Sequence, residues 1–267
     1  MKLFYRKFGS GHPIIILHGL LGASDNWVTI AKGLSDKYEV FIPDLRNHGQ
    51  SPHSPIFNYN VLAGDLLEFF DDRLLSKAAL IGHSMGGKIA MNFTLEHPQR
   101  VAKLVVIDIS PGSYPVRNIH DDVLNAMASV NFDLIRSREE VDLMLRQTIN
   151  SEQIRLLIMK NLYRIGKSRW AWRINLEAIN ENITEISREL VHTAVFPGSV
   201  MFIKGGRSDY IQQADEANIL KYFPDAIIET IEKASHWVHS DAPEEMHKLM
   251  DNFLENKCSC QNQPQGI

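Results

Sequence analysis

The chain has 267 residues, a formal net charge of −4 and a hydrophobic content of 44%, which is the composition of a globular protein with a sizeable core. The small acidic excess gives no sign of a surface for nucleic acid or an anionic membrane. No apolar run has the ~18 residues that a transmembrane helix needs, and the first eleven residues predict a strand and turn, not a signal peptide. Both cysteines, Cys258 and Cys260, lie in the last ten residues, so the body of the chain has no disulfide and we expect a cytoplasmic protein.

Short β-branched runs alternate with longer amphipathic runs over most of the chain, which is typical of an α/β fold with a mostly parallel sheet. Residues 2–8 alternate in polarity and predict an antiparallel edge strand. Continuous apolar runs predict strands buried on both faces at residues 13–17, 40–43, 78–81, 104–109, 200–203 and 226–231. Helical spacing predicts helices at 61–74, 86–96 and 243–255, the last with Asp241 as its N-cap.

The alternation stops between about residues 113 and 196, where several helical patterns follow one another. Ser137 with Glu140 forms a candidate capping box, and Ser151 is a candidate N-cap of the next helix. Chain from both sides of this segment is needed to complete the sheet. We therefore predict an α/β core of residues 1–112 and 197–255, a helical cap of residues 113–196 inserted over the carboxyl edge of the sheet, and a disordered polar tail of residues 256–267.

The strongest local motif is Gly82-His83-Ser84-Met85-Gly86, between a predicted buried strand and a predicted helix. This is the known G-x-S-x-G arrangement of a nucleophile elbow, in which a sharp strand-to-helix turn exposes the central serine. The flanking glycines allow a close backbone approach that a Cβ would prevent. The hydroxyl of Ser84 is then expected at a helix N-terminus, where free N–H groups favour a developing negative charge.

Acyl transfer needs N–H donors directed at the oxygen that becomes negative in the tetrahedral intermediate. We expect the backbone N–H of Met85, at the start of the helix, to be one donor. The second donor is expected in the loop after the first buried strand, within His18-Gly19-Leu20-Leu21-Gly22. We assign it to the N–H of Leu20.

The general base and the acid are expected in the chain order serine, acid, histidine. His236 follows the strand predicted at 226–231 through a short loop, which places it at the same sheet edge as Ser84 and predicts it to be the base. The residues alone leave two acids open. Asp108 ends the strand after the elbow helix, and Asp209 follows the strand at 200–203; either carboxylate would orient the second nitrogen of the imidazole.

Five ordered motifs together resemble the α/β-hydrolase superfamily and, within it, the bacterial YbfF-type esterases. They are His18–Gly22, Asp44–Pro52, the elbow, Val106–Pro111 and His236–His239. The resemblance implies an α/β-hydrolase fold with a mostly parallel eight-stranded sheet flanked by helices and an inserted helical cap. It also implies hydrolysis of acyl esters or thioesters without a cofactor or metal.

The resemblance gives Ser84 as nucleophile, His236 as base and Asp108 as acid. Many other α/β-hydrolases carry the acid after the later strand, in a Gly-x-x-Asp-Pro context. Here Ser208 stands at that acid position and Asp209 falls one residue later, which keeps Asp209 as a substitute acid. Ser208 is then expected to hydrogen-bond near the loop of His236.

The expected reaction is a two-step acyl transfer from a small-molecule ester or thioester through an acyl-enzyme. A hydrolase or lyase of C–C bonds with the same triad is the alternative among enzymes, and a non-catalytic ligand-binding protein is the alternative outside them. We call residues 18–22 the oxyanion turn, and we expect residues 46–48 to brace the loop beside it. Candidates for the lining of an acyl pocket are Trp27, Trp170, Trp172 and Phe196.

Overall fold

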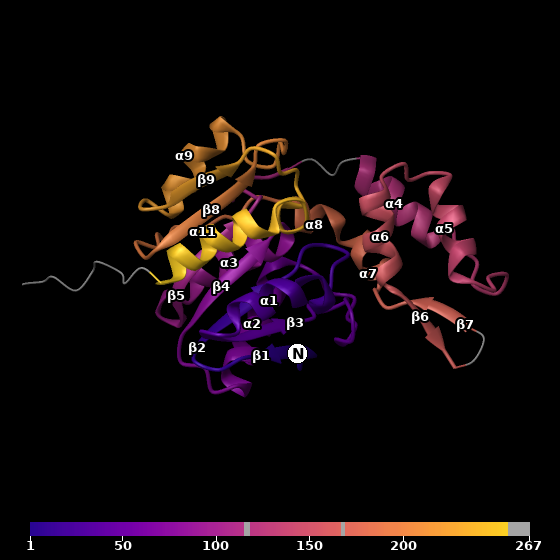
Figure 1. Cartoon of the computed structure of the whole chain (residues 1–267), viewed down its shortest axis with the longest axis horizontal. Helices are drawn as coiled ribbons and strands as arrows, with labels where there is room; N and C mark the ends of the chain where they lie inside the picture. Colours follow the sequence, from indigo (N-terminus) through magenta and orange to yellow (C-terminus); the bar gives the residue numbers. More distant parts are fainter. Residues whose placement is uncertain (115–117, 167–168, 256–267) are drawn as a thin grey trace, which may run out of the picture.

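The fold is α/β and its main sheet is mostly parallel, as predicted. The computed structural model describes residues 1–114, 118–166 and 169–255 (Figure 1), so the expected disordered tail, with both cysteines, lies outside the described residues. The strand order is β1-β3-β2-β4-β5-β8-β9, with β1 antiparallel to β3 and every other pair parallel. The strands are β1 Tyr5–Phe8, β2 His12–Leu17, β3 Tyr38–Pro43, β4 Ala78–His83, β5 Val101–Ile107, β8 Val200–Gly205 and β9 Ile227–Ile231. The sheet thus has seven strands in the described residues, where the resemblance implied eight.

Helices cover both faces of this sheet. Successive residues of a strand point to opposite faces, so each central strand contributes side chains to two cores. Ile15 and Leu17 of β2 belong to the core under α2, α3 and α9, and Ile14 and Ile16 belong to the core under α1 and α11. The helices are α1 Val28–Leu34, α2 Tyr59–Asp72, α3 Met85–Glu96, α9 Gln213–Tyr222, α10 Val238–Asp241 and α11 Pro243–Glu255. Burial on both faces explains why the strands are continuous apolar runs in the sequence. In the described part of the chain, no helix combines the length and the apolar character needed to span a bilayer.

A group of further elements, which we call the insertion, lies between β5 and β8 and extends to one side of the sheet (Figure 1). Its elements are α4 Asn118–Ala128, α5 Arg138–Arg146, α6 Glu152–Lys160, β6 Leu162–Ile165, β7 Arg169–Trp172, α7 Leu176–Glu181 and α8 Ile183–Ser187. The N-caps predicted for α5 and α6 are confirmed: Ser137 Oγ accepts from the N–H of Glu140 (3.3 Å) and Ser151 Oγ from that of Ile154 (3.4 Å). The full capping box does not form, because the carboxylate of Glu140 accepts from the N–H of Arg136 (2.8 Å). The antiparallel hairpin β6–β7 was not predicted.

The chain leaves the core for the insertion and returns from it at adjacent points. The N–H of Leu190 donates to the carbonyl of Pro111 (2.8 Å). Beside this contact, the ammonium of Lys88 on α3 donates to the carbonyl oxygens of Gly112 (2.6 Å) and Arg188 (2.5 Å). Lys88 is fully buried, and burial lowers its pKa to about 7. One buried side chain therefore ties both connections to the helix that follows Ser84.

Asp241 does not cap α11, and that prediction is wrong. The helix begins after Ala242, whose carbonyl accepts from the N–H of Met246 (3.0 Å). The carboxylate of Asp241 instead accepts from the N–H (2.8 Å) and the hydroxyl (2.5 Å) of Ser235. It therefore fastens the loop that carries the neighbouring His236.

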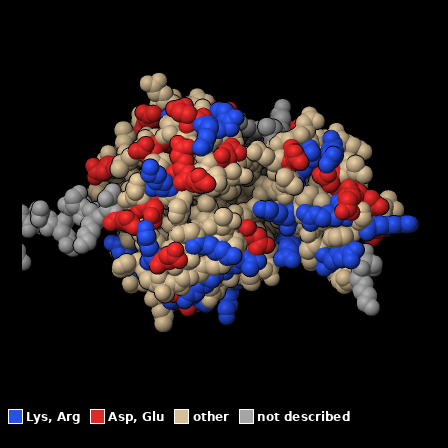
Figure 2. All heavy atoms as spheres, in the orientation of Figure 1, with Lys and Arg blue, Asp and Glu red and all other residues tan. Residues whose placement is uncertain are grey.

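Charges of both signs are spread over the face of the molecule seen in Figure 2, where Lys and Arg are interspersed with Asp and Glu. This distribution agrees with the small net charge of −4. Polyanions are attracted by a broad positive surface, and on this face Lys and Arg form no such surface because Asp and Glu lie among them.

The turn from β4 into α3 depends on glycines at points of backbone contact. A Cβ on Gly86 would lie 2.3 Å from the carbonyl oxygen of Leu17, and a Cβ on Gly82 would lie 2.3 Å from that of Gly86. Both distances are far below van der Waals contact. The first turn of α3 can therefore pack directly on the end of β2 only without side chains at these positions.

We expect Gly86→Ala to lower the free energy of unfolding by about 1–3 kcal/mol, because the added methyl group forces the turn away from β2. Gly64→Ala is the matched control: Gly64 lies in α2 with no atom within 4 Å of the added Cβ, so this change should raise stability by about 0.5–1 kcal/mol. Urea unfolding followed by circular dichroism measures both. A Gly86→Ala protein as stable as wild type would contradict the close approach.

Candidate active site

The residues expected to act in catalysis all lie at one edge of the sheet. Strands β2, β4, β5, β8 and β9 form consecutive parallel pairs, and the carboxyl ends of parallel strands meet at the same edge, where ligands bind in such folds. Leu20 follows β2, Ser84 follows β4, Asp108 follows β5, Ser208 and Asp209 follow β8, and His236 follows β9. The topology therefore gathers side chains that are far apart in the sequence.

Ser84, His236 and Asp108 form a continuous hydrogen-bonded series. His236 Nε2 lies 3.0 Å from Ser84 Oγ, and His236 Nδ1 lies 2.7 Å from Asp108 Oδ2. A carboxylate only accepts hydrogen bonds, so the proton of the neutral imidazole resides on Nδ1. Nε2 is then free to accept the hydroxyl proton of Ser84, which is the geometry required of a general base.

The carboxylate of Asp108 is completely buried and fully hydrogen-bonded. Its Oδ1 accepts from the N–H of Gly205 (2.9 Å), and its Oδ2 accepts from the hydroxyl of Ser208 as well as from His236. Ser208, expected near the histidine loop, thus contacts the carboxylate of Asp108 itself. Asp209 is exposed on the loop after β8, while Nδ1 of His236 is engaged by Asp108. The geometry favours Asp108 over Asp209 as the partner of His236.

Backbone strain is concentrated at this edge. Leu21 (φ 62°), Ser84 (φ 53°) and Asp108 (φ 52°) are three of the five non-glycine residues with positive φ in the described chain, and such conformations cost roughly 1–3 kcal/mol each. Neighbouring strands hold two of them. The N–H of Ser84 donates to the carbonyl of Ile107 (3.0 Å), and that of Asp108 to the carbonyl of Ile203 (2.9 Å).

The two N–H groups expected to stabilise an oxyanion flank Ser84. Met85 is the first residue of α3, so its N–H has no partner within the helix. The turn that contains Leu20 passes close to the serine, because a Cβ on Gly19 would lie only 3.3 Å from Ser84 Cβ. Neither N–H donates a hydrogen bond to another residue that the structure describes.

Two buried histidines hold the loops on either side of this turn. His48 Nε2 accepts from the N–H of Leu21 (3.2 Å), and His18 Nε2 accepts from the N–H of Leu45 (3.0 Å). Each Nδ1 faces a backbone carbonyl oxygen within 2.9 Å. Burial lowers the pKa of His18 to about 4 and that of His48 to about 3. Both rings are therefore neutral near pH 7, which keeps each Nε2 available as an acceptor.

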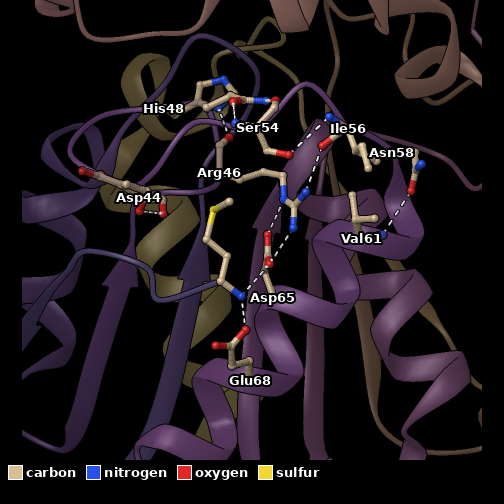
Figure 3. Close-up of polar contacts among 12 residues, drawn as sticks. Asp44, Arg46, His48, Ser54, Ile56, Asn58, Val61, Asp65 and Glu68 are labelled. Atoms are coloured by element: carbon tan, nitrogen blue, oxygen red, sulfur yellow. Dashed lines mark hydrogen bonds and ion pairs between the residues drawn. The ribbon is translucent and has the colours of Figure 1, made fainter.

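The loop after β3 braces the oxyanion turn, as expected for residues 46–48. Figure 3 shows Arg46 of this loop directed at Asp65 on α2; its Nη2 donates to Asp65 Oδ1 (2.7 Å) and its Nη1 to the carbonyl of Ile56 (2.9 Å). Asp44 accepts from the N–H of Ser24 (2.6 Å). These buried bonds fix the loop, and through it the ring of His48.

A cavity of about 290 Å³ opens beside Ser84, between the sheet edge and the insertion. Its apolar wall combines residues of the oxyanion turn with side chains of α4 and α6, and its polar wall comes mainly from α6 and the loop after β8. The apolar residues include Leu20, Leu21, Val123, Ile154 and Leu157, and the polar ones include Gln153, Arg207 and Asp209. None of Trp27, Trp170, Trp172 and Phe196 lines this cavity, so that expectation is wrong; Trp27 instead packs under α1, stacked on His239.

Two residues beside the site were not predicted. The ring of Tyr210 stacks on that of His236, with centroids 3.9 Å apart and planes 20° apart. His83 Nε2 donates to the carbonyl oxygen of His236 (2.9 Å) and thereby holds the backbone of His236. The only sequence signal was position, because Tyr210 follows Asp209 and His83 precedes Ser84.

Within the described residues, no group of three or more His, Cys, Asp or Glu side chains is placed to hold a metal ion.

Comparison with known proteins shows the family of this chain. The family profile for the alpha/beta hydrolase fold matches residues 12–135. The sn-1-specific diacylglycerol lipase ABHD11 of Danio rerio is 36% identical over 92% of this chain and 80% of its own length, and the esterase YbfF of Escherichia coli is 34% identical over 91% and 93%. A solved structure of a marine microorganism esterase is 40% identical and superposes with a TM-score of 0.92 over 94% of this chain and 99% of that one. The chain therefore belongs to the α/β-hydrolase family, with a likeness to the YbfF esterase within it.

Proposed function

We propose that this protein hydrolyses carboxylic esters or thioesters of small molecules through an acyl-enzyme formed on Ser84. The observation that carries the proposal is the series of hydrogen bonds from Ser84 Oγ through His236 to the buried Asp108, at the wall of a cavity. The relatives named as an esterase and a lipase support the same class of reaction.

In the first step, Ser84 Oγ attacks the acyl carbon while its proton passes to His236 Nε2. Asp108 stabilises the imidazolium that forms, and the N–H groups of Leu20 and Met85 stabilise the oxyanion. The tetrahedral intermediate then collapses: the bond to the leaving oxygen or sulfur breaks, and that atom takes the proton from His236. In the second step, water gives a proton to His236 and attacks the acyl carbon. The bond to Ser84 Oγ then breaks, Oγ takes the proton back from His236, and the acid is released.

The insertion acts as a cap in this proposal. Core residues 1–112 and 197–255 supply the catalytic groups, and segment 113–196 supplies the outer wall of the cavity through Val123 on α4 and through Ile154 and Leu157 on α6. Apolar side chains at this wall suit an acyl chain and reduce the access of water. The polar groups at the other wall suit the more hydrated leaving group.

We expect the protein to hydrolyse p-nitrophenyl butyrate and to be labelled on Ser84 by a fluorophosphonate probe. Ser84→Ala should lose both the hydrolysis and the labelling, because the atom that forms the covalent bond is gone. Ser10→Ala, at an exposed position, is the control and should be labelled like wild type. Mass spectrometry of the intact protein measures the adduct. If Ser84→Ala took up the probe as wild type does, the proposal would be wrong.

The assignment of the acid is tested by a pair of isosteric changes. Asp108→Asn should lower kcat by about 10⁴-fold, because an amide no longer fixes the imidazole tautomer or stabilises the imidazolium. Asp209→Asn, at the neighbouring exposed carboxylate, should leave kcat close to the wild-type value. Steady-state kinetics on the same nitrophenyl ester distinguishes them. Equally mild effects, or a larger effect at Asp209, would contradict Asp108 as the acid.

A further inference from the structure

The oxyanion turn contains a strained residue that is held by both the core and the insertion. The N–H of Gly22 donates to the carbonyl of Gly19 (3.0 Å), which closes a four-residue turn. Leu21, its third residue, has a φ of 62°, a conformation that favours glycine at this turn position. A leucine stays in this conformation only where its surroundings fix it.

Buried side chains from two parts of the protein hold the two polar backbone groups of Leu21. His48, from the loop after β3, accepts from its N–H (3.2 Å). Asn161, from the end of α6 in the insertion, donates its Nδ2 to the carbonyl oxygen (2.8 Å). That carbonyl shares a peptide group with the N–H of Gly22, which closes the turn onto Gly19.

Asn161 is itself held firmly. It is the C-cap residue of α6, and its N–H donates to the carbonyl of Ile158 (2.9 Å). Its carbonyl accepts from the N–H of Arg173, just after β7 (2.9 Å). The residue is 3% exposed, so little space is left for another rotamer of the side chain. A fixed donor therefore reaches from the insertion to the turn, 140 positions away in the sequence.

We propose that Asn161 is a positioning residue that fixes the peptide group after Leu21 and thereby directs the N–H of Leu20 at the oxyanion. The proposal rests on the proposed function, in which Leu20 is an oxyanion donor. Without the amide of Asn161, Leu21 relaxes toward negative φ and the N–H of Leu20 turns away from the oxyanion. The insertion then completes the catalytic geometry as well as lining the cavity.

The expected effect falls on the transition state, because the oxyanion exists only there. Loss of a whole donor lowers kcat by about 100- to 1,000-fold, and a donor that is present but poorly directed should lose less. We expect Asn161→Leu to lower kcat on p-nitrophenyl butyrate by about 10- to 100-fold while KM changes little. Asn161→Asp, which keeps the shape of the side chain but offers no N–H, should lower kcat in the same way at pH 8.

Asn182→Leu is the matched control. Asn182 is the C-cap residue of α7, and its Nδ2 donates to the carbonyl of Pro55 (3.0 Å). It thus joins the insertion to a core loop by the same kind of bond, away from the oxyanion turn. Its replacement should leave kcat near the wild-type value.

A trifluoromethyl ketone inhibitor gives a second readout, because it forms a tetrahedral adduct with serine that carries an oxyanion. Its inhibition constant should rise in the Asn161 variants by the factor by which kcat/KM falls, and should stay unchanged in Asn182→Leu. Circular dichroism and thermal unfolding establish that each variant is folded; if Asn161→Leu is not, the nearly isosteric Asn161→Asp carries the test.

Three outcomes overturn an assignment, and they are distinguishable. Wild-type kcat and inhibition in folded Asn161 variants, with Ser84→Ala inactive, would reject the role of Asn161 and leave the proposed function standing. Equal losses in the Asn161 and Asn182 variants would mean a general loosening of the insertion and would also reject it. Full activity in Ser84→Ala would reject the proposed function itself.

Discussion

The direct backbone contact between the first turn of α3 and the end of β2 is the constraint on which the site depends. Gly86 lies against the carbonyl of Leu17 with no room for a Cβ. The turn from β4 into α3 therefore lies in direct contact with the end of β2, from which the oxyanion turn begins. That contact brings Ser84 and the N–H of Met85 beside Leu20. The hydrogen bonds around Asp108 and His236 then complete an arrangement whose spacing the glycines have already determined.

Much of the fold and the site could be predicted, because their signals are local. A buried strand, a glycine-flanked serine and a helix are adjacent in sequence, so Ser84 and Met85 could be assigned, and His236 follows from the edge at which parallel strands end. The choice between Asp108 and Asp209 could not be made from the residues alone, since both follow strands. It depends on the Gly205 N–H and the Ser208 hydroxyl, which reach Asp108 only through the pairing of β5 with β8. The contact of Asn161 with Leu21 was missed for the same reason, because long-range packing leaves no periodic signal. The hairpin β6–β7 is local, but its two four-residue strands show no clear alternation of apolar and polar residues.

The histidines at this edge make two kinds of contact. His18, His48 and His83 are buried against backbone groups, and burial lowers the pKa of each. They serve as fixed, neutral hydrogen-bonding groups that hold loops in place. His236 instead faces the carboxylate of Asp108 and the stacked ring of Tyr210, and its Nε2 faces the hydroxyl of Ser84. The same residue type therefore holds loops through backbone contacts and, in the role that we propose for His236, accepts a proton.

The insertion joins the core at two adjacent points, and this arrangement affects how its length and sequence can vary. Because Pro111 and Leu190 are bonded to each other and Lys88 binds the carbonyls beside them, the sheet meets the same two chain ends whatever the length of chain between them. The entropic cost of closing such a loop grows only slowly with its length. An insertion of another length or sequence can therefore join the same two chain ends without a change to the residues around Ser84. Under the role that we propose for Asn161, a different insertion must also donate a hydrogen bond to the carbonyl of Leu21.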